Sequence, residues 1–483
     1  MNNVMNHRSC YVNFAEHLQN KWNPNLYYPE APNQWTEDEW IRFFTMLKAF
    51  GYNIFEFWLP PTLFSPEMIK GDPIAIRFIE KMSLIIDTAH NKGLKVKMLC
   101  GVNTIGANWY HACPNDLNDR KLILMLWQFW CRTFSDVDFI GIFPGDPGGC
   151  NRNGCSYKTF IELALEIAEQ AGNTNPAAGL EVNTWGTPFC CWDDDMHLVP
   201  GWDGSFAMIS DKKYNTPEEP LYIWNGNQDR AKKAMEYFIN RLPSFPKETI
   251  VAINLGFSPD GDATHGGDAR QYAREVAAIR PIVSWDYSVS EGELVNYPHW
   301  RLPRMSSRRR EEFACAPYQG GMVYTMTPKL NILSLYAGAQ FLLNPNANPD
   351  DISRQFCSCI FGDEHAVLGE LFEAFEVVQG WGHYPRRNWS KPALIKVYTE
   401  IIERLEAANM TKCNLPILPD PDEYRKDILW FARKFMDMAG QCPDRNLIKS
   451  QYRKYALAIY DYIPKSVDER TEEASDKFSN ILL

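Results

Sequence analysis

The stretch from Tyr52 to Cys100 decides the fold class. It begins with Tyr52-Asn-Ile-Phe-Glu-Phe-Trp58, an apolar run of strand length, and ends with a second such run, Leu94-Lys-Val-Lys-Met-Leu-Cys100. Between them a helical pattern covers about 73–92 and stops at Gly93. Two β-rich runs joined by a helix are typical of a parallel βαβ unit, because parallel strands need a long crossover connection. We therefore expect an α/β fold with a parallel sheet.

The same alternation of strand and helix continues on both sides of this stretch. The six further predicted strands are Tyr11-Val-Asn-Phe14, Asp138-Phe-Ile-Gly-Ile-Phe143, Gly179-Leu-Glu-Val-Asn-Thr-Trp185, Thr249-Ile-Val-Ala-Ile-Asn-Leu255, Pro281-Ile-Val-Ser-Trp285 and Gly321-Met-Val-Tyr-Thr-Met326. The helices between and after them are predicted near 36–50, 119–134, 156–171, 228–242, 268–279 and 330–342. Thr36 and Glu39 have the spacing of a capping box, and Gly51 ends that first helix. Eight strands with this alternation predict a closed (β/α)8 TIM barrel, whereas an open doubly wound sheet would carry a glycine-rich phosphate turn after its first strand.

A change of pattern marks the end of the barrel. Beyond Asn344-Pro-Asn-Ala-Asn-Pro349 the sequence is wholly helical in pattern, with periodic segments near 350–361, 364–379, 391–408, 421–440 and 443–462. The sequence thus predicts a barrel domain over 1–345 and an α-helical C-terminal extension over 346–483 that packs on it.

Composition and charge exclude several classes of partner. The 483 residues fit a barrel with an appendage, and 45% hydrophobic with 23% charged residues is a globular balance. A net charge of −11 argues against a nucleic-acid partner, because phosphate binding needs a basic face. No apolar run approaches membrane-spanning length and the first residues lack a signal peptide's apolar region, so no membrane partner and a cytoplasmic location are expected, unless a signal peptide has been removed. The 13 cysteines are odd in number and several lie within predicted elements, which argues against a disulfide framework.

The predicted ends of the strands are rich in carboxylates and aromatic rings. Active sites of such barrels gather at the C-terminal ends of the strands. The candidate positions there are Glu16, His17, Glu56, Trp58, Asn103, Asp146, Glu181, Asn183, Trp185, Asp260, Asp262, Asp286, Glu291 and Tyr324. Together with 16 tryptophans and 22 tyrosines they favour a small carbohydrate substrate, since pyranose faces stack on flat rings. Trp58, Trp185 and Trp285 are the candidate sugar platforms, with core packing as the alternative for any single tryptophan.

The turn Phe143-Pro-Gly-Asp-Pro-Gly-Gly-Cys150 is the sharpest local feature. It holds Asp146 on a rigid, open loop that suits a general acid, although Asp-Pro-Gly-Gly is also ordinary turn chemistry. Glycoside hydrolysis needs two carboxyl groups across the scissile bond. Strands four and seven lie on opposite sides of a barrel mouth, which pairs Asp146 with Asp286 or Glu291. Asp260 and Asp262 offer a second candidate base, or form a polar turn.

Other charged groups suggest substrate contacts more than metal binding. Glu56 and Glu181 interrupt apolar strands and must point into the mouth or be paired, because an unpaired buried carboxylate is costly. Arg301 and Arg304 are candidates for a clamp on an anionic sugar such as a uronic acid. For Arg308-Arg-Arg310, a solvated basic face on a loop and helix start is at least as good an interpretation as a role in binding. Cys150 and Cys155 have no second pair at zinc spacing, so no metal and no cofactor are expected.

Over about residues 10–410 the chain resembles the α-glucuronidase and β-hexosaminidase-like glycoside hydrolases. The resemblance rests on the layout, on the turn after strand four, and on the motifs Asn344-Pro-Asn-Ala-Asn-Pro-Asp350 and Gly362-Asp-Glu-His365. The resemblance implies a (β/α)8 barrel with a helical C-terminal region. It also implies an acid after strand four, matched by Asp146 in place of the usual Glu, with Asp260 or Asp262 and Asp286 or Glu291 assisting the water. The adjacent acidic pair of the hexosaminidase-like members is absent, because Pro147 follows Asp146, so we expect a direct two-carboxylate mechanism.

Three functions remain open from the sequence. The leading one is an exo-acting glycosidase for oligosaccharides or glycosides. A metal-dependent sugar isomerase or aldolase would use Glu181, Asp286 and His17, although the 9 histidines show no ligand spacing. A non-catalytic carbohydrate-binding barrel is the third. The sugar, its anomeric configuration and the oligomeric state, with a homodimer among the options, are not determined by the sequence.

Overall fold

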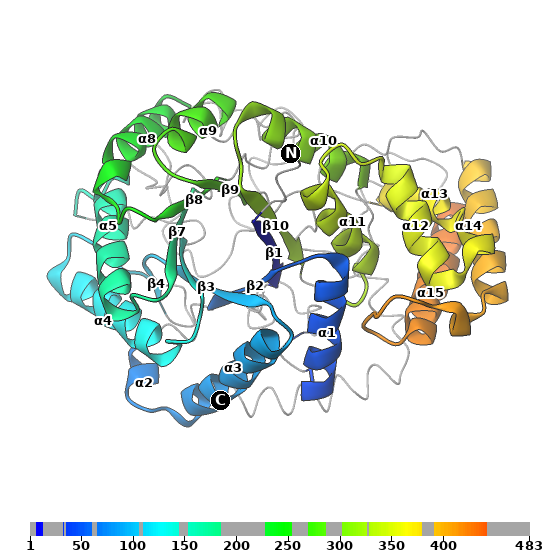
Figure 1. The fold of residues 1–483 in the computed structure, drawn as a ribbon, viewed down its shortest axis with the longest axis horizontal. Helices are drawn as coiled ribbons and strands as arrows, with labels where there is room; N and C mark the ends of the chain where they lie inside the picture. Colours follow the sequence, from blue (N-terminus) through cyan, green and yellow to red (C-terminus); the bar gives the residue numbers. More distant parts are fainter. Residues whose placement is uncertain are drawn as a thin grey trace.

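The chain forms a closed barrel of parallel strands surrounded by helices (Figure 1). The computed structural model describes residues 6–12, 32, 35–59, 65–105, 110–143, 153–184, 228–253, 269–285, 302–325, 328–378 and 391–441. The barrel strands are β1 His7–Val12, β2 Ile54–Leu59, β3 Lys95–Gly101, β6 Phe139–Phe143, β7 Gly179–Asn183, β8 Ile250–Ile253, β9 Ile282–Ser284 and β10 Gly320–Thr325. They close in the order β1-β10-β9-β8-β7-β6-β3-β2, which confirms the predicted (β/α)8 barrel.

Helices cover the outside of the barrel and continue beyond it. The barrel helices are α1 Glu37–Phe50, α3 Pro73–Asn91, α4 Leu117–Thr133, α5 Tyr157–Thr174, α8 Gln228–Arg241, α9 Ala269–Ala277, α10 Leu302–Cys315 and α11 Ile332–Leu343. Smaller elements are α2 Pro66–Ile69, the antiparallel pair β4 Thr104–Ile105 and β5 Tyr110–His111, and the 3-10 turn η3 Leu242–Ser244. Among the described helices, none is both long and apolar enough to cross a bilayer.

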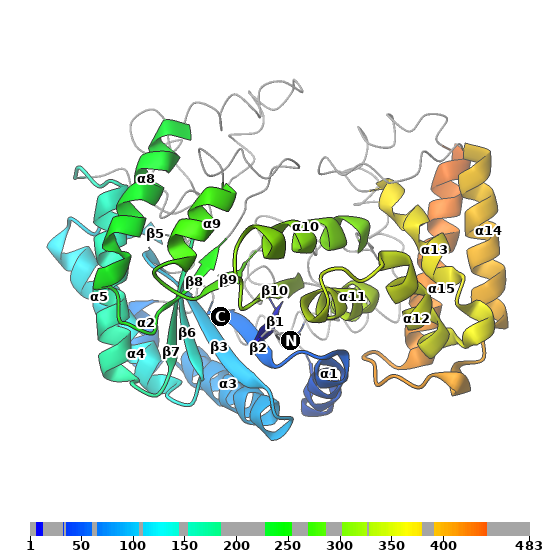
Figure 2. The same cartoon turned by 45° about the horizontal axis from the view of Figure 1, so that its top comes forward.

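The C-terminal helices lie together on one side of the barrel, next to α11 (Figure 2). They are α12 Pro349–Phe361, η5 Asp363–His365, α13 Leu368–Leu371, η6 Phe372–Val378, α14 Lys391–Ala407, η7 Met410–Lys412 and α15 Pro421–Gln441. This confirms the predicted helical extension. The helix predicted over 443–462 lies outside the described residues.

The start of α1 shows how the sequence specifies an element. Thr36 Oγ1 accepts a hydrogen bond from the Glu39 amide at 3.3 Å, and Glu39 Oε2 accepts one from the Thr36 amide at 2.8 Å, so the predicted capping box is present. Gly51 ends the helix with φ 108°, a left-handed conformation that favours glycine. Glu39 Oε1 also binds Lys329 Nζ at 2.7 Å, which joins α1 to the segment before α11.

Alternating side chains divide the core into two parts. On β2, Phe55 and Phe57 belong to the large core between the strands and the helices, while Trp58 belongs to a smaller cluster inside the barrel. The interior cluster consists of Tyr11, Trp58, Leu99, Phe143, Ile250, Ala252, Val283, Trp285, Met322 and Tyr324. Because both faces of each strand are buried, the strands read as nearly continuous apolar runs.

Two predictions about the helices were wrong. The segment over 364–379 is not one helix but η5, α13 and η6, and Gly369 there packs so closely on α12 that an added Cβ would lie 2.4 Å from the Ser353 carbonyl carbon. The loop and basic face expected around Arg308 and Arg309 is instead the interior of α10, where these side chains are 6% and 1% exposed.

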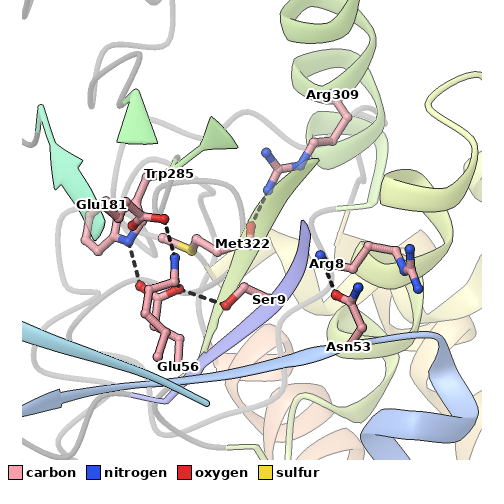
Figure 3. A network of polar contacts seen from close by, with 9 residues as sticks. Arg8, Ser9, Asn53, Glu56, Glu181, Trp285, Arg309 and Met322 are labelled. Atoms are coloured by element: carbon pink, nitrogen blue, oxygen red, sulfur yellow. Dashed lines mark hydrogen bonds and ion pairs between the residues drawn. The ribbon is translucent and has the colours of Figure 1, made fainter. Parts of the chain in front are cut away.

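The burial of Arg309 is possible because its charge and donors are satisfied. Its guanidinium binds Glu312 Oε2 at 2.7 Å and also donates to Ser284 Oγ and to the Met322 carbonyl, the last contact being drawn in Figure 3. Glu312 Oε1 accepts a further hydrogen bond from Ser284 Oγ at 2.6 Å. The group therefore fastens α10 to β9 and β10 from outside the barrel.

Candidate active site

The site predicted from the sequence is divided between described and undescribed residues. Candidates that lie outside the described residues are Glu16, His17, Asp146, Trp185, Asp260, Asp262, Asp286, Glu291 and Arg301, while Arg304 lies on α10 with its side chain not described. Candidates that the structure places are Glu56, Trp58, Asn103, Glu181, Asn183, Trp285 and Tyr324, each 5% exposed or less. These belong to the barrel interior or to the ends of its strands.

Strand register sorts the interior side chains into layers. Parallel pairing aligns Tyr11 with Glu56 and with Tyr324, and aligns Glu56 with Lys97, so all four point into the barrel. Trp58 lies two positions after Glu56 on β2, so it is the next side chain of that strand to point inward and lies closer to the C-terminal mouth. The aromatic layer of the interior therefore combines Tyr11 and Tyr324, which stand level with Glu56 and Lys97, with Trp58, which lies closer to the mouth.

The aromatic layer is continuous across the lumen. The ring centroids of Trp58 and Phe143 are 5.8 Å apart, and those of Phe143 and Trp285 are 5.3 Å apart. Tyr11 then lies 5.5 Å from Trp285 and 5.1 Å from Tyr324. These tilted contacts are the geometry that aromatic pairs prefer, and they join the rings into one buried cluster inside the barrel.

A cluster of buried charges packs against these rings. Lys97 Nζ binds Glu181 Oε2 at 2.6 Å and Glu56 Oε2 at 3.0 Å, with all three side chains 3% exposed or less. Glu56 Oε2 also accepts a hydrogen bond from Ser9 Oγ at 2.8 Å, and Glu56 Oε1 accepts one from Trp285 Nε1 at 2.9 Å (Figure 3). The two carboxylates that interrupt apolar strands are therefore paired with one cation.

Sequence reasoning missed Lys97 and Ser9. The signal was present, because Lys97 interrupts the apolar run of β3 in the same way that Glu56 interrupts that of β2. Identifying the pair required the register of the two strands, which places Glu56 opposite Lys97. Ser9 precedes the strand predicted at Tyr11–Phe14, since β1 begins earlier, at His7.

The pKa values of Lys97 and Glu181 are both raised, although burial and the attraction between the ammonium and the carboxylates act in opposite directions on each. Burial alone would lower the pKa of Lys97, but the carboxylates of Glu181 and Glu56 outweigh it and raise that pKa above its ordinary value of 10.5. Burial also raises the pKa of Glu181 above 4.5, with Lys97 opposing the shift and Glu56 adding to it. Lys97 is therefore an ammonium at neutral pH, and Glu181 binds its proton more tightly than a carboxyl in water.

The two asparagine candidates differ in their surroundings. Asn103 Nδ2 donates to the Ala112 carbonyl at 2.9 Å, and the Ala112 amide donates to the Asn103 carbonyl at 2.9 Å, which ties the end of β3 to the segment after β5. Asn183 is fully buried at the end of β7, two positions beyond Glu181. Asn183 therefore lies in the layer between Glu181 and the mouth.

The described cysteines are thiols, and two of them meet. Cys155, the second cysteine of the Cys-x4-Cys motif, has its Sγ 3.4 Å from Cys113 Sγ, and both side chains are buried. Among the residues that the structure describes, no three His, Cys, Asp or Glu side chains gather as potential ligands of one metal ion.

Comparison with known proteins gives a likeness in structure but none in sequence. No protein-family model and no curated protein matches the chain. In structure the chain is similar to a GH138 enzyme targeting pectin rhamnogalacturonan II, with a TM-score of 0.53 and 8% identity over 99% of this chain and 77% of that one. A mutant O-GlcNAc hydrolase of Thermobaculum terrenum also matches, with a TM-score of 0.46 and 16% identity over 93% of this chain and 90% of that one. The expected likeness to glycoside hydrolases with a (β/α)8 barrel is thus confirmed at the level of the fold.

Proposed function

We propose that the chain is a glycoside hydrolase whose substrate enters the C-terminal mouth of the barrel. The observation that carries this proposal is the aromatic layer of Tyr11, Trp58, Phe143, Trp285 and Tyr324, which packs against buried carboxylates, with Trp285 bound to Glu56. Flat rings suit the face of a pyranose, and acceptors beside them suit its hydroxyl groups. The fold shared with a GH138 enzyme supports the same class of reaction.

In the finer form of the proposal the enzyme is exo-acting and uses two carboxyl groups without a cofactor. Asp146 protonates the leaving oxygen, and Asp286 or Glu291 acts as base or nucleophile. Trp58 and Trp285 hold the sugar ring. The wider binding set keeps Glu56, Asn103, Glu181, Asn183, Trp185, Asp260, Asp262, Arg301 and Tyr324.

The cluster of buried charges weighs against the isomerase or aldolase alternative. Glu181 would be a metal ligand in that reaction, but its Oε2 atom already lies 2.6 Å from an ammonium, which would repel a divalent cation. Lys97 is also unsuited to forming a Schiff base, because its raised pKa keeps the nitrogen protonated. The interior therefore favours a glycosidase over either alternative reaction.

A screen of aryl glycosides followed by one substitution tests the proposal. Replacing Asp146 by Asn should slow the hydrolysis of a glycoside with a poor leaving group more than that of an activated aryl glycoside, because only the former needs protonation. Asp138→Asn is the matched control, since Asp138 lies at the opposite end of the same strand, where its carboxylate contacts His90 at 2.9 Å. The proposal fails if no glycoside is hydrolysed, and its assignment of the acid fails if Asp146→Asn keeps normal rates on both substrates.

A further inference from the structure

We propose that Glu56 is a positioning residue, whose carboxylate fixes the indole of Trp285 in the orientation that a sugar meets at the barrel mouth. The proposal rests on the proposed function only in that the mouth binds a sugar. It adds a specific physical link between the buried charges and the aromatic layer.

The contact between the two residues crosses the barrel lumen. Glu56 lies on β2 and Trp285 directly follows β9, and strands β1 and β10 separate these two in the barrel. Trp285 Nε1 nevertheless donates to Glu56 Oε1 at 2.9 Å, and the two side chains are 3% and 0% exposed. Figure 3 shows both side chains reaching into the same space from opposite directions. The hydrogen bond therefore depends on the closed barrel and not on local sequence.

This hydrogen bond selects one orientation of the indole. An indole has one polar hydrogen, so turning the ring over would take Nε1 away from its acceptor. Contacts with Tyr11 at 5.5 Å and Phe143 at 5.3 Å hold the ring in the layer, but ring contacts are much less directional than a hydrogen bond to a charged oxygen. The carboxylate thereby fixes the direction in which Trp285 Nε1 points inside the barrel.

Glu56 is itself prevented from turning. Its Oε2 atom binds Ser9 Oγ at 2.8 Å and Lys97 Nζ at 3.0 Å, which leaves Oε1 for the indole. Lys97 is fixed in turn by Glu181 at 2.6 Å. A chain of charge-assisted contacts thus runs from β7 through β3 and β2 to the residue after β9. Asp286, a proposed catalytic carboxylate, is the next residue in the sequence, so the same contact anchors the strand end from which it departs.

Glu312 provides a matched control for the test. It is also a fully buried carboxylate that binds a cation and a hydroxyl, and the hydroxyl belongs to Ser284, the last residue of β9 and the one directly before Trp285. Glu312 acts from outside the barrel, through α10. Glu56→Gln and Glu312→Gln therefore remove comparable buried charges, and it is Glu56 that accepts the hydrogen bond of the indole.

The experiment follows the indole N–H signals of the tryptophan-labelled, full-length protein by NMR. The Trp285→Phe variant identifies the Trp285 signal. It also removes the hydrogen bond between the two residues without changing Glu56. The probes are methyl glucosides, glucuronides and N-acetylglucosaminides of both anomeric forms. We expect a bound sugar to shift the Trp285 signal, and Glu56→Gln to move that signal in the free protein. The same substitution should weaken sugar binding about tenfold, which is the effect of losing one hydrogen bond to a charged group. Glu312→Gln should leave both the signal and the affinity nearly unchanged, even where it lowers the melting temperature.

Several results would overturn the inference. It is wrong if Glu56→Gln leaves the Trp285 signal in place, or if Glu56→Gln and Glu312→Gln weaken sugar binding equally. Should Glu56→Gln fail to fold, Trp285→Phe takes its place, and an unchanged affinity in that variant refutes the role of the indole. A sugar that binds without disturbing Trp285 also refutes it. Hydrolysis is measured separately, so binding without hydrolysis refutes the proposed function and leaves the positioning role standing.

Discussion

Removing the ammonium of Lys97 should destabilise the protein in a way that depends on pH. In the Lys97→Met variant the side chain keeps a similar length, but Glu56 and Glu181 lose the cation that lies 3.0 and 2.6 Å from their oxygens. Both carboxylates are 1% exposed or less, so water cannot replace the lost partner. Breaking a buried ion pair of this kind costs about 3–5 kcal/mol, because it leaves charge buried without compensation. A loss of about 4 kcal/mol lowers the ratio of folded to unfolded protein roughly a thousandfold.

The pH dependence follows from the pKa of Glu181. That pKa is raised above 4.5 by burial, against the opposing effect of Lys97, so removing Lys97 must raise it further. A carboxyl with a raised folded-state pKa favours the folded state below its unfolded pKa, and this contribution is lost as the pH rises through the folded-state value. The variant should therefore lose more stability at about pH 8 than at about pH 5. In the wild type, the raised pKa of Lys97 adds stability that is present below 10.5 and is lost only above it.

Urea denaturation of the wild type and the variant at these two pH values measures both effects. Lys95→Met is the control, because Lys95 is an exposed residue two positions earlier on β3 whose ammonium lies 5.4 Å from the Phe139 ring centroid. A cation–π contact at an exposed site is worth about 0.5–1 kcal/mol and should not vary over this pH range. The reasoning is refuted if Lys97→Met costs no more than Lys95→Met, or if its cost is the same at both pH values.

Three further predictions concern packing, capping and thiol chemistry. Gly141→Ala should lower the free energy of unfolding by about 1–3 kcal/mol, because the new Cβ would lie 2.5 Å from Leu99 Cδ1 inside the barrel. Adding Leu99→Ala to the same chain should restore part of that loss in a double-mutant cycle. Additive effects of the two substitutions would contradict this contact. Thr36→Ala should lower the free energy of unfolding by about 1 kcal/mol through loss of the helix cap, measured by urea denaturation, and an unchanged midpoint would speak against the capping box. Treatment with diamide should join Cys113 and Cys155, whose Sγ atoms are 3.4 Å apart, in a disulfide detected by peptide mass; Cys155→Ser is the control that must not form it.

Local patterns in the sequence were enough to predict the architecture. All eight barrel strands overlap predicted runs, β1 by only two residues, and the helix that begins after Thr36 has the predicted cap. These features follow from neighbouring residues, since alternating or continuous apolar runs and capping motifs act within a few positions of the chain. Where local patterns misled, the cause was tertiary. Arg308 and Arg309 form a charged run typical of a solvated surface, yet both are buried, and Arg309 is held there by Glu312 and by groups on β9 and β10.

The sequence by itself determined that carboxylates and aromatic rings would gather inside a barrel, because the period of each strand places Glu56, Trp58 and Glu181 on its inner face. Only the tertiary structure decided which of them meet. The 2.9 Å contact from Glu56 to Trp285 and the 2.6 Å contact from Lys97 to Glu181 join residues that are far apart in the chain. Their pairing depends on the register between strands and on closure of the barrel. Strand periodicity specifies the direction of a side chain, but it contains no information about the partner across the lumen.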